Sequence, residues 1–371
     1  MSASATLRLY AADLNYPREL QVHTAASGLV ASLAARYLVI ERSDGFAGAG
    51  EVRANISYLA HIPESAVAPA IVDLCRRLPW SAPPEEILKT VQGLNASVPH
   101  VATAAVENML IEGIARRDGI PVARLLGGDW QAAVETNQCL FWSPDEVFDR
   151  LAERYLGEGF RQLKVRIAVG GFDQDLSRLR RLRERAGPDV SIAVDANGAW
   201  DADEAIDKLR ALEPIGLSYV EQPTTPGDWS AFRKALGATS IPLMVDEGLA
   251  SDADVDALCA IGAPALAHLK IVKLGGPTQV VAAMTRFRDA GVGVMVGQMN
   301  EGALATAITA HCVMALGPRY AELYGCYGLL DDVTPGVSYA GGAIRTPPGP
   351  GLGTMFDPAR CRLLWSEDFL G

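Results

Sequence analysis

Regularly spaced cysteines, a signal peptide and long hydrophobic runs are all missing from this sequence. Its six cysteines form no C-x-x-C pair, which argues against a zinc ribbon or a redox motif, and scattered cysteines are typical of a reducing cytosol. The first ten residues contain no basic segment followed by an apolar stretch, so we expect no signal peptide. Charges or glycines interrupt every apolar stretch before the roughly 20 residues that a membrane helix needs. We therefore expect a cytoplasmic protein with no membrane partner.

Positive charge is also scarce. The chain has 371 residues, of which 33 are Lys or Arg and 44 are Asp or Glu, giving a net charge of -11. A nucleic-acid-binding surface needs a basic footprint, so this balance argues against a nucleic-acid partner. It does not exclude a small anionic substrate, because one metal ion or lysine can dominate the local field. The length is enough for two domains or for one large one.

The first 130 residues have the pattern of an α+β domain. Strand-like segments rich in β-branched and aromatic residues come early, and helical segments follow them. The last of these helices is long and is ended by Gly119-Ile120-Pro121. We predict strands over 5–13 and 35–43 and helices over 63–78, 83–94 and 103–118.

From about residue 134 the pattern changes to short apolar strands that alternate with amphipathic helical segments. Eight such units with right-handed crossovers predict a closed (β/α)8 barrel over 131–330, and an open doubly wound sheet is the competing architecture. The Gly- and Pro-rich tail, 331–371, is expected to pack back on the first domain. The predicted barrel strands are 136–142, 162–167, 191–197, 217–222, 242–247, 265–270, 292–298 and 320–324.

Three carboxylates stand at the ends of three consecutive predicted strands: Asp195, Glu221 and Asp246. Barrel enzymes place their active sites at this end of the strands, so these side chains should converge. Any one of them alone is more simply interpreted as a helix N-cap. Three in register would repel one another unless a cation lies between them, and all-oxygen ligation suits Mg²⁺ better than Zn²⁺. The spacing therefore predicts a Mg²⁺ site.

Cationic side chains accompany these carboxylates. Alternation along the second strand puts Lys164 and Arg166 on one face, and Lys270 ends the sixth strand, across the barrel. Lysines beside a metal can exchange protons where neighbouring positive charge lowers their pKa. Lys273 lies three residues after Lys270, so strand alternation would point it to the opposite face. We therefore interpret it as structural or as a loop contact. His268 shares the inward parity of Lys270 but comes earlier in the strand, which favours a core role.

These motifs together resemble the enolase superfamily, and more narrowly its muconate lactonizing (cycloisomerase) subgroup in the mandelate racemase/muconate lactonizing enzyme family. The resemblance spans nearly the whole chain, and the combination is highly specific although each piece alone is weak. It implies an α/β fold, an enolase-like modified TIM barrel with an N-terminal α+β capping domain that the C-terminal tail completes. The matching motifs are Lys164-x-Arg166, Asp195-x-Asn197, Glu221-Gln222-Pro223, Asp246-Glu247, Lys270-x-x-Lys273, Gly297-Gln298-Met299-Asn300-Glu301-Gly302 and Glu322-Leu323-Tyr324-Gly325.

The resemblance also implies roles for the matching residues. A Mg²⁺ held by Asp195, Glu221 and Asp246 would bind the substrate carboxylate and stabilise the enediolate formed when the α-proton leaves. Lys270 would be the acid/base on one face of the substrate. Lys164 would help to neutralise the carboxylate or enediolate.

The capping domain would close the site from above. Its likeness to the family implies lid loops over 16–27 and 52–60. Contacts to the substrate or to the metal ligands would come from Asn197, Glu247, Gln298 and Glu301, and specificity contacts from Arg53, His23 and Tyr58.

One departure from the subgroup bears on the reaction. The subgroup usually has Lys-x-Lys on the second strand, and here the second position is Arg166. Arginine stays protonated, so it is a poor proton carrier but a good anion clamp. This argues against racemization through both faces. The predicted eighth strand also lacks the Asp-x-Asp with which dipeptide epimerases of the subgroup hold an ammonium, which argues against epimerization.

We therefore predict a muconate cycloisomerase-like isomerase that uses Mg²⁺ to abstract the proton α to a carboxylate through an enediolate. It would bind a small carboxylate substrate and form a homo-oligomer. A dehydratase (lyase) of a small hydroxy acid is an alternative, as is a racemase or epimerase of an amino acid derivative. A catalytically silent binding protein on the same scaffold is the alternative from another class.

Overall fold

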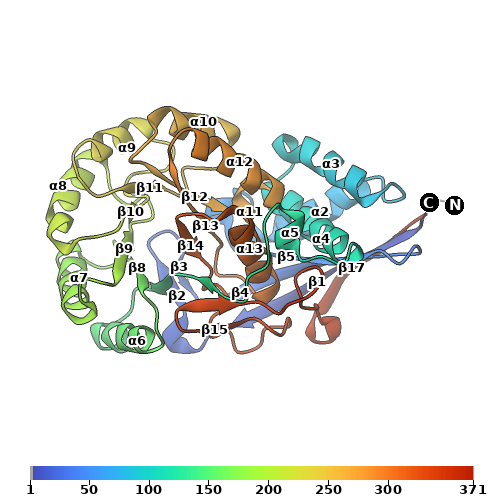
Figure 1. Ribbon diagram of the computed structural model, residues 1–371, viewed down its shortest axis with the longest axis horizontal. Helices are drawn as coiled ribbons and strands as arrows, with labels where there is room; N and C mark the ends of the chain where they lie inside the picture. Colours follow the sequence, from blue (N-terminus) through green and yellow to red (C-terminus); the bar gives the residue numbers. More distant parts are fainter. Residues whose placement is uncertain (1–2, 371) are drawn as a thin grey trace.

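The fold, described for residues 3–370 by a computed structural model, joins a cap to a barrel (Figure 1). The cap contains an antiparallel sheet of β1 (Ala5–Asn15), β4 (Ser32–Arg42), β5 (Ala47–Arg53) and β17 (Arg362–Phe369), in the order β17-β1-β4-β5. Along β1, Leu7 and Leu9 are buried whereas Arg8 and Tyr10 are partly exposed, as strand alternation requires. The C-terminal tail supplies β17, so it completes the cap as predicted.

The remaining cap elements are three longer helices, of which α4 (His100–Arg117) packs on the sheet and the other two pack on α4, and several short segments. The other two longer helices are α2 (Glu64–Arg76) and α3 (Pro84–Leu94). The short segments are η1 (Arg18–Leu20), β2 (Val22–Thr24), β3 (Gly28–Val30), α1 (Ser57–Ala60), η2 (Asn95–Ser97) and α5 (Val122–Leu125).

Strand β5 corrects the predicted lid over 52–60. Val52 and Arg53 end this strand, and α1 follows, so a loop across the whole range is wrong. The strand was not predicted because glycine and alanine have low strand propensity. The glycines have a packing reason: a β-carbon on Gly48 would lie 2.3 Å from the Met109 carbonyl oxygen of α4. The predicted loop over 16–27 likewise contains η1 and β2.

The barrel is an eight-stranded parallel sheet in the order β14-β13-β12-β11-β10-β9-β8-β7. The amide of Asn137, just before β7, donates to the carbonyl of Ala321 in β14 at 3.0 Å and so joins the two ends of the sheet. The predicted barrel architecture is therefore confirmed. The strands are β7 (Gln138–Leu140), β8 (Gln162–Arg166), β9 (Ser191–Asp195), β10 (Val220–Glu221), β11 (Leu243–Val245), β12 (Leu266–Lys270), β13 (Gly293–Gly297) and β14 (Tyr320–Glu322).

Helices follow the barrel strands in sequence and surround them (Figure 1). Helix α8 begins with a capping box between Asp201 and Glu204, and α13 is buried along nearly its whole length. No helix among residues 3–370 has the length and apolar character needed to cross a membrane. The helices are α6 (Asp145–Gly157), α7 (Phe172–Ala186), α8 (Ala202–Leu212), α9 (Trp229–Leu236), α10 (Asp252–Ile261), α11 (Ile271–Leu274), α12 (Pro277–Asp289) and α13 (Ala303–Leu316), with η3 (Glu213–Ile215) after α8.

The tail adds β15 (Ser338–Ala340), β16 (Ala343–Arg345) and η4 (Pro358–Arg360) before β17. Strand β16 pairs with β6 (Val134–Glu135), a two-residue strand at the start of the barrel segment. The tail thus contacts both parts of the fold. The domain limits 1–130, 131–330 and 331–371 are kept as a proposal.

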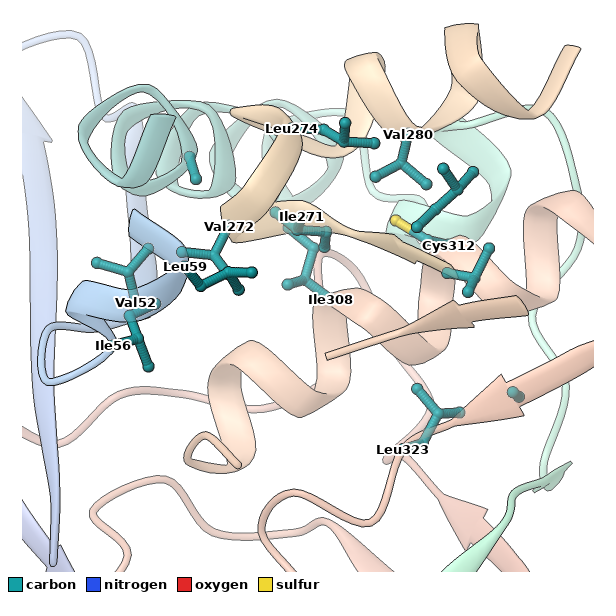
Figure 2. Close-up of a cluster of buried hydrophobic side chains, with 14 of the residues drawn as sticks. Val52, Ile56, Leu59, Ile271, Val272, Leu274, Val280, Ile308, Cys312 and Leu323 are labelled. Atoms are coloured by element: carbon teal, nitrogen blue, oxygen red, sulfur yellow. The ribbon is translucent and has the colours of Figure 1, made fainter. Parts of the chain in front are cut away.

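Apolar and ionic contacts join the cap to the barrel. In the buried cluster of Figure 2, Leu59 of α1 lies beside Val272 of α11, directly after the strand that carries Lys270. Two buried cap glutamates cap barrel helices: Glu51 accepts from Gly302 and Ala305 at the start of α13, at 2.7 and 3.0 Å. Glu107 of α4 accepts from the Thr278 amide at the start of α12 at 2.6 Å. Through these hydrogen bonds to free helix N-terminal amides, the cap holds the starts of α12 and α13.

Glu107 should make stability depend on pH. Burial raises the pKa of Glu107 from 4.5 to about 7, against the opposing hydrogen bonds from Thr278. A raised carboxyl pKa gives stability that is complete below about pH 4.5 and is lost as pH rises through about 7. Relative to Glu107→Gln, which keeps an acceptor but cannot ionise, the wild type should lose on the order of 3 kcal/mol between pH 4.5 and 8. Urea unfolding at both pH values measures this. The prediction is contradicted if the wild type and Glu107→Gln differ in free energy of unfolding by the same amount at both pH values. It is also contradicted if the exposed Glu86→Gln variant changes the pH dependence in the same way.

Candidate active site

Charged residues gather at the carboxyl ends of the barrel strands. Arg166 of β8 pairs in register with Asp195 of β9, which pairs with Glu221 of β10. Lys270 of β12 and Glu322 of β14 pair with the same residue of β13. These five residues are all buried. The strand order places β8 and β12 four strands apart, on opposite sides of an eight-stranded barrel.

Lys164 binds three carboxylates in the barrel interior. Its Nζ lies 2.8 Å from Glu221 Oε1, 2.7 Å from Glu322 Oε2 and 3.4 Å from Asp195 Oδ2. Burial lowers the pKa of Lys164, but these carboxylates outweigh it and raise the pKa well above its ordinary value. Although burial opposes the change, Lys164 and neighbouring cations lower the pKa of Glu322 to about 2. Lys164 is therefore a fixed positive charge.

Arg166 is held from several sides. Its Nη1 donates to Asp195 Oδ2, its Nη2 to the Tyr324 hydroxyl at 3.2 Å, and its Nε to Cys139 Sγ at 3.3 Å. The guanidinium also lies 5.8 Å from the centre of the Phe141 ring. Burial opposes ionisation, yet Asp195 raises the pKa of Arg166 well above its ordinary value. The side chain is a permanent cation that positions Asp195.

Two lysines form ion pairs with the Asp246 carboxylate. Lys270 Nζ lies 2.5 Å from its Oδ2, and Lys273 Nζ lies 2.8 Å from its Oδ1. Although burial would raise it, the two lysines hold the pKa of Asp246 well below its usual range. Burial lowers the pKa of Lys270, but Asp246 outweighs that effect and raises it; burial lowers the pKa of Lys273. The parity expected for Lys273 does not apply, because the strand ends at Lys270 and α11 turns the chain back toward Asp246.

The site can hold a metal ion. One ligand atom each from Glu221, Asp246 and His268 lie within 4.8 Å of one another. Within residues 3–370, Glu221 Oε2 is buried without a hydrogen-bond partner, which is costly unless a cation or donor reaches it. Asp195 is not in this trio, and its carboxylate is bound by Arg166 and Lys164. Carboxylate oxygens suit Mg²⁺ better than an imidazole does. Ligation by Asp195, Glu221 and Asp246 stays a prediction.

His268 is buried, as its predicted core role requires, but it also contacts the charged network. Its Nδ1 lies 3.2 Å from Glu221 Oε1. Burial, together with Lys270, lowers the pKa of His268 well below its ordinary value, so the ring is neutral.

A small cavity of about 20 Å³ lies between the cap and these strand ends. Such a space holds about one water molecule, so a substrate requires movement of the cap segments. Asn197 Nδ2 donates to Glu247 Oε1 at 2.8 Å, and burial raises the pKa of Glu247 to about 8. The lining brings together eight of the predicted residues, namely Arg53, Tyr58, Arg166, Asn197, Asp246, Glu247, Lys270 and Gln298.

Two predicted contacts lie elsewhere. His23 packs edge-on against Trp142, with 4.9 Å between ring centres, and lines a separate cavity of about 640 Å³ beside α6. Glu301 is buried and accepts from the Met299 amide at 3.2 Å, but it does not line the small cavity. Glu301 comes after the end of β13, where strand alternation no longer applies, whereas His23 lies in the short cap strand β2 and faces Trp142.

Three residues of the site were not among those predicted: Glu322, Tyr324 and Asn300. Glu322 binds Lys164, and Tyr324 and Asn300 line the cavity. The Glu322-Leu323-Tyr324 motif contained a usable signal, because alternation puts its first and third residues on one face. For Asn300 the chain had already left its strand, and the sequence offered no such signal.

Comparisons with known proteins agree with this geometry. Residues 147–360 match the enolase C-terminal domain-like family. The chain is 31% identical to the L-Ala-D/L-Glu epimerase of Bacillus subtilis over 260 residues, 68% of this chain and 70% of that protein. It is 28% identical to muconate cycloisomerase 1 of Pseudomonas putida over 360 residues, 93% of this chain and 92% of that protein. A structure of the muconate lactonizing enzyme from Pseudomonas fluorescens with muconolactone superposes with a TM-score of 0.88 at 25% identity, covering 95% of this chain and 96% of the other.

Proposed function

This chain belongs to the enolase C-terminal domain-like family, and from that premise we propose that it is a muconate cycloisomerase-type isomerase that uses Lys270 to remove the proton α to a carboxylate. Its relatives are enzymes that include a cycloisomerase and an epimerase. The substrate would be a small acid that fits between the cap and the strand ends.

The placement of Lys270 carries this proposal. Its side chain lines the cavity across the barrel from Arg166. Arg166 is bound to Asp195 and cannot give up its proton under ordinary conditions. Lys164, on the same strand as Arg166, is held by three carboxylates. A single proton carrier therefore serves one face of the substrate.

The carboxylates on the intervening strands would complete the site. When held by Asp195, Glu221 and Asp246, a Mg²⁺ would fix the substrate carboxylate and stabilise the negative charge that develops on it. The low pKa of Asp246 supports an ionised ligand. Asn197 orients Glu247 toward the cavity through the 2.8 Å hydrogen bond between them.

Lys270 must be neutral to accept a proton. In the present arrangement burial lowers its pKa while contact with Asp246 raises it. A cation on Asp246 would offset the second effect and leave burial to favour the neutral amine. The negative charge of Asp246, which keeps Lys270 protonated, is thus the charge that a bound metal ion would neutralise.

A proton carrier on only one face of the substrate favours some of the alternative reactions over others. A racemase or epimerase that works through both faces needs a second proton carrier, and Arg166 does not supply one. A dehydratase of a small hydroxy acid needs only one carrier, so the geometry permits it as well as a cycloisomerase. The longer alignment with muconate cycloisomerase 1 supports the cycloisomerase. A silent binding protein would leave the placement of Lys270 without a purpose.

Proton NMR in D₂O tests the proposal. The protein, with Mg²⁺, would be incubated with resolved enantiomers of hydroxy acids and N-acyl amino acids and with muconate-type diacids. We expect deuterium at the α-carbon of one enantiomer, with retained configuration, and products that separate isomerization from elimination. Racemization would contradict the one-face mechanism. Exchange with none of the acids would contradict the proposed function for these classes.

A further inference from the structure

Gln222 directly follows Glu221, one of the predicted metal ligands, and its backbone leaves strand β10 in an uncommon conformation. Its φ is 36°, in the left-handed region that residues other than glycine rarely adopt. The residue is only 2% exposed. Such a conformation costs free energy and persists only where the surrounding contacts impose it. The contacts of Gln222 should therefore show what this conformation serves.

The Gln222 side chain holds the end of the neighbouring strand, β11. Its Oε1 accepts from the Asp246 amide at 2.9 Å and from the Gly248 amide at 3.0 Å, and its Nε2 donates to the Thr224 carbonyl at 2.8 Å. Strand β11 ends one residue before Asp246, so the side chain supplies an acceptor just beyond the regular strand. It thus fixes the backbone on both sides of Glu247.

The backbone of Gln222 joins the strands on both sides of β10. Its amide donates to the Met244 carbonyl of β11 at 2.8 Å, and its carbonyl accepts from the Gly198 amide, beyond β9, at 2.7 Å. A change at Gln222 would therefore shift these three strand ends relative to one another. The same strand ends carry the three predicted metal ligands, Asp195, Glu221 and Asp246.

We infer that Gln222 is a positioning residue for the divalent cation. It fixes the Asp246 carboxylate relative to that of Glu221, because its side chain holds the backbone of the first and its own backbone continues directly from the second. The inference rests on the metal site of the proposed function. Hydrogen-bonding partners that orient metal ligands are commonly worth about 10- to 100-fold in metal affinity.

Cation size distinguishes positioning from a general loss of structure. Mg²⁺ requires near-ideal octahedral geometry with oxygen distances of about 2.0–2.1 Å, whereas Ca²⁺ accepts flexible sites with distances of about 2.3–2.6 Å. Precise placement of the ligands therefore matters more for Mg²⁺ than for Ca²⁺. A change in net charge or in the folded fraction affects both cations alike, so the ratio of their dissociation constants reports positioning.

Calorimetric titration with Mg²⁺ and with Ca²⁺ tests the inference. Gln222→Met keeps the length of the side chain and removes its hydrogen-bonding groups. We expect its Kd for Mg²⁺ to rise about 10- to 100-fold and its Kd for Ca²⁺ to change by less than about threefold. Gln222→Glu keeps an acceptor for the two amides and should retain the wild-type ratio. The matched control, Gln92→Met, removes an amide that donates to Thr278 Oγ1 at 3.1 Å and should leave the ratio unchanged.

Hydrogen exchange of the metal-free protein, followed by mass spectrometry, tests the same contacts without a cation. In Gln222→Met the segment 243–249 should exchange faster, because the Asp246 and Gly248 amides lose their acceptor, and the segment 266–270 should not change. If Gln222→Met does not fold, Gln222→Asn replaces it in both measurements. Asparagine tolerates the left-handed region, but its side chain is one methylene too short for these contacts.

Two results would overturn the inference while leaving the proposed function intact. One is a wild-type protein that binds Mg²⁺ and a Gln222→Met variant whose ratio of dissociation constants is unchanged. The other is unchanged exchange over 243–249 in that variant. Wild-type protein that binds neither cation would contradict the metal site of the proposed function, and the inference with it.

Discussion

Lys270→Met should lose α-proton exchange, with a rate at least about 10³-fold below that of the wild type. Methionine matches the length of the lysine stem but has no group that accepts a proton. The loss follows from the geometry, because Lys270 is the one proton carrier that we assign to the reacting face. Lys270→Arg should be equally inactive, since a guanidinium stays protonated. The rate of deuterium incorporation at the α-carbon, followed by proton NMR, measures the effect.

Controls separate this loss from misfolding. Removing Lys270 leaves Asp246 with one lysine instead of two, so the variant should still bind Mg²⁺, and calorimetric titration checks this. Lys89→Met, an exposed position on α3, should exchange at the wild-type rate. A Lys270→Met protein that binds Mg²⁺ and still exchanges within tenfold of the wild type would assign the base to another residue.

Glu221→Gln and Asp246→Asn should each weaken Mg²⁺ binding by at least about a hundredfold, since each removes a charged ligand from a buried site. Ligand-orienting partners alone are worth about 10- to 100-fold, so a direct ligand should exceed that range. Asp195→Asn adds a distinct expectation, because it also leaves Arg166 without its carboxylate. Calorimetric titration with Mg²⁺ measures all three.

The matched control for the carboxylates is Asp252→Asn, an exposed acid on α10 whose side chain is 92% accessible. It should bind Mg²⁺ as the wild type does. Wild-type affinity in Glu221→Gln and Asp246→Asn would remove the metal from the proposed site. It would also leave the unpartnered Oε2 of Glu221 without an explanation.

Much of the site could be predicted because strands impose simple rules. A two-residue period puts Lys164 and Arg166 on one face, and one βα unit separates each carboxylate from the next. These rules also gave the barrel and the position of Lys270. These rules no longer apply where a strand ends. Lys273 reaches Asp246 because α11 begins at Ile271, and the two-residue alternation of a strand does not continue into a helix.

Other features depend on tertiary contacts that no local pattern encodes. Arg53 lies on β5, whose small residues resemble a loop in sequence but are required by the close approach of α4. The engagement of Asp195 by Arg166 depends on the pairing of β8 with β9. His23 was expected near the site because the family resemblance implied a lid loop over 16–27, yet it packs on Trp142 instead.

The central claim is metal-assisted removal of an α-proton, and deuterium exchange with and without Mg²⁺ tests it most directly. Wild-type protein would be stripped with a chelator, dialysed into D₂O buffer and incubated with the small acids, before and after Mg²⁺ is restored. We predict no exchange in the stripped protein and α-carbon exchange on return of Mg²⁺. Exchange that continues unchanged after chelation, or no exchange in a protein that demonstrably binds Mg²⁺, would contradict it.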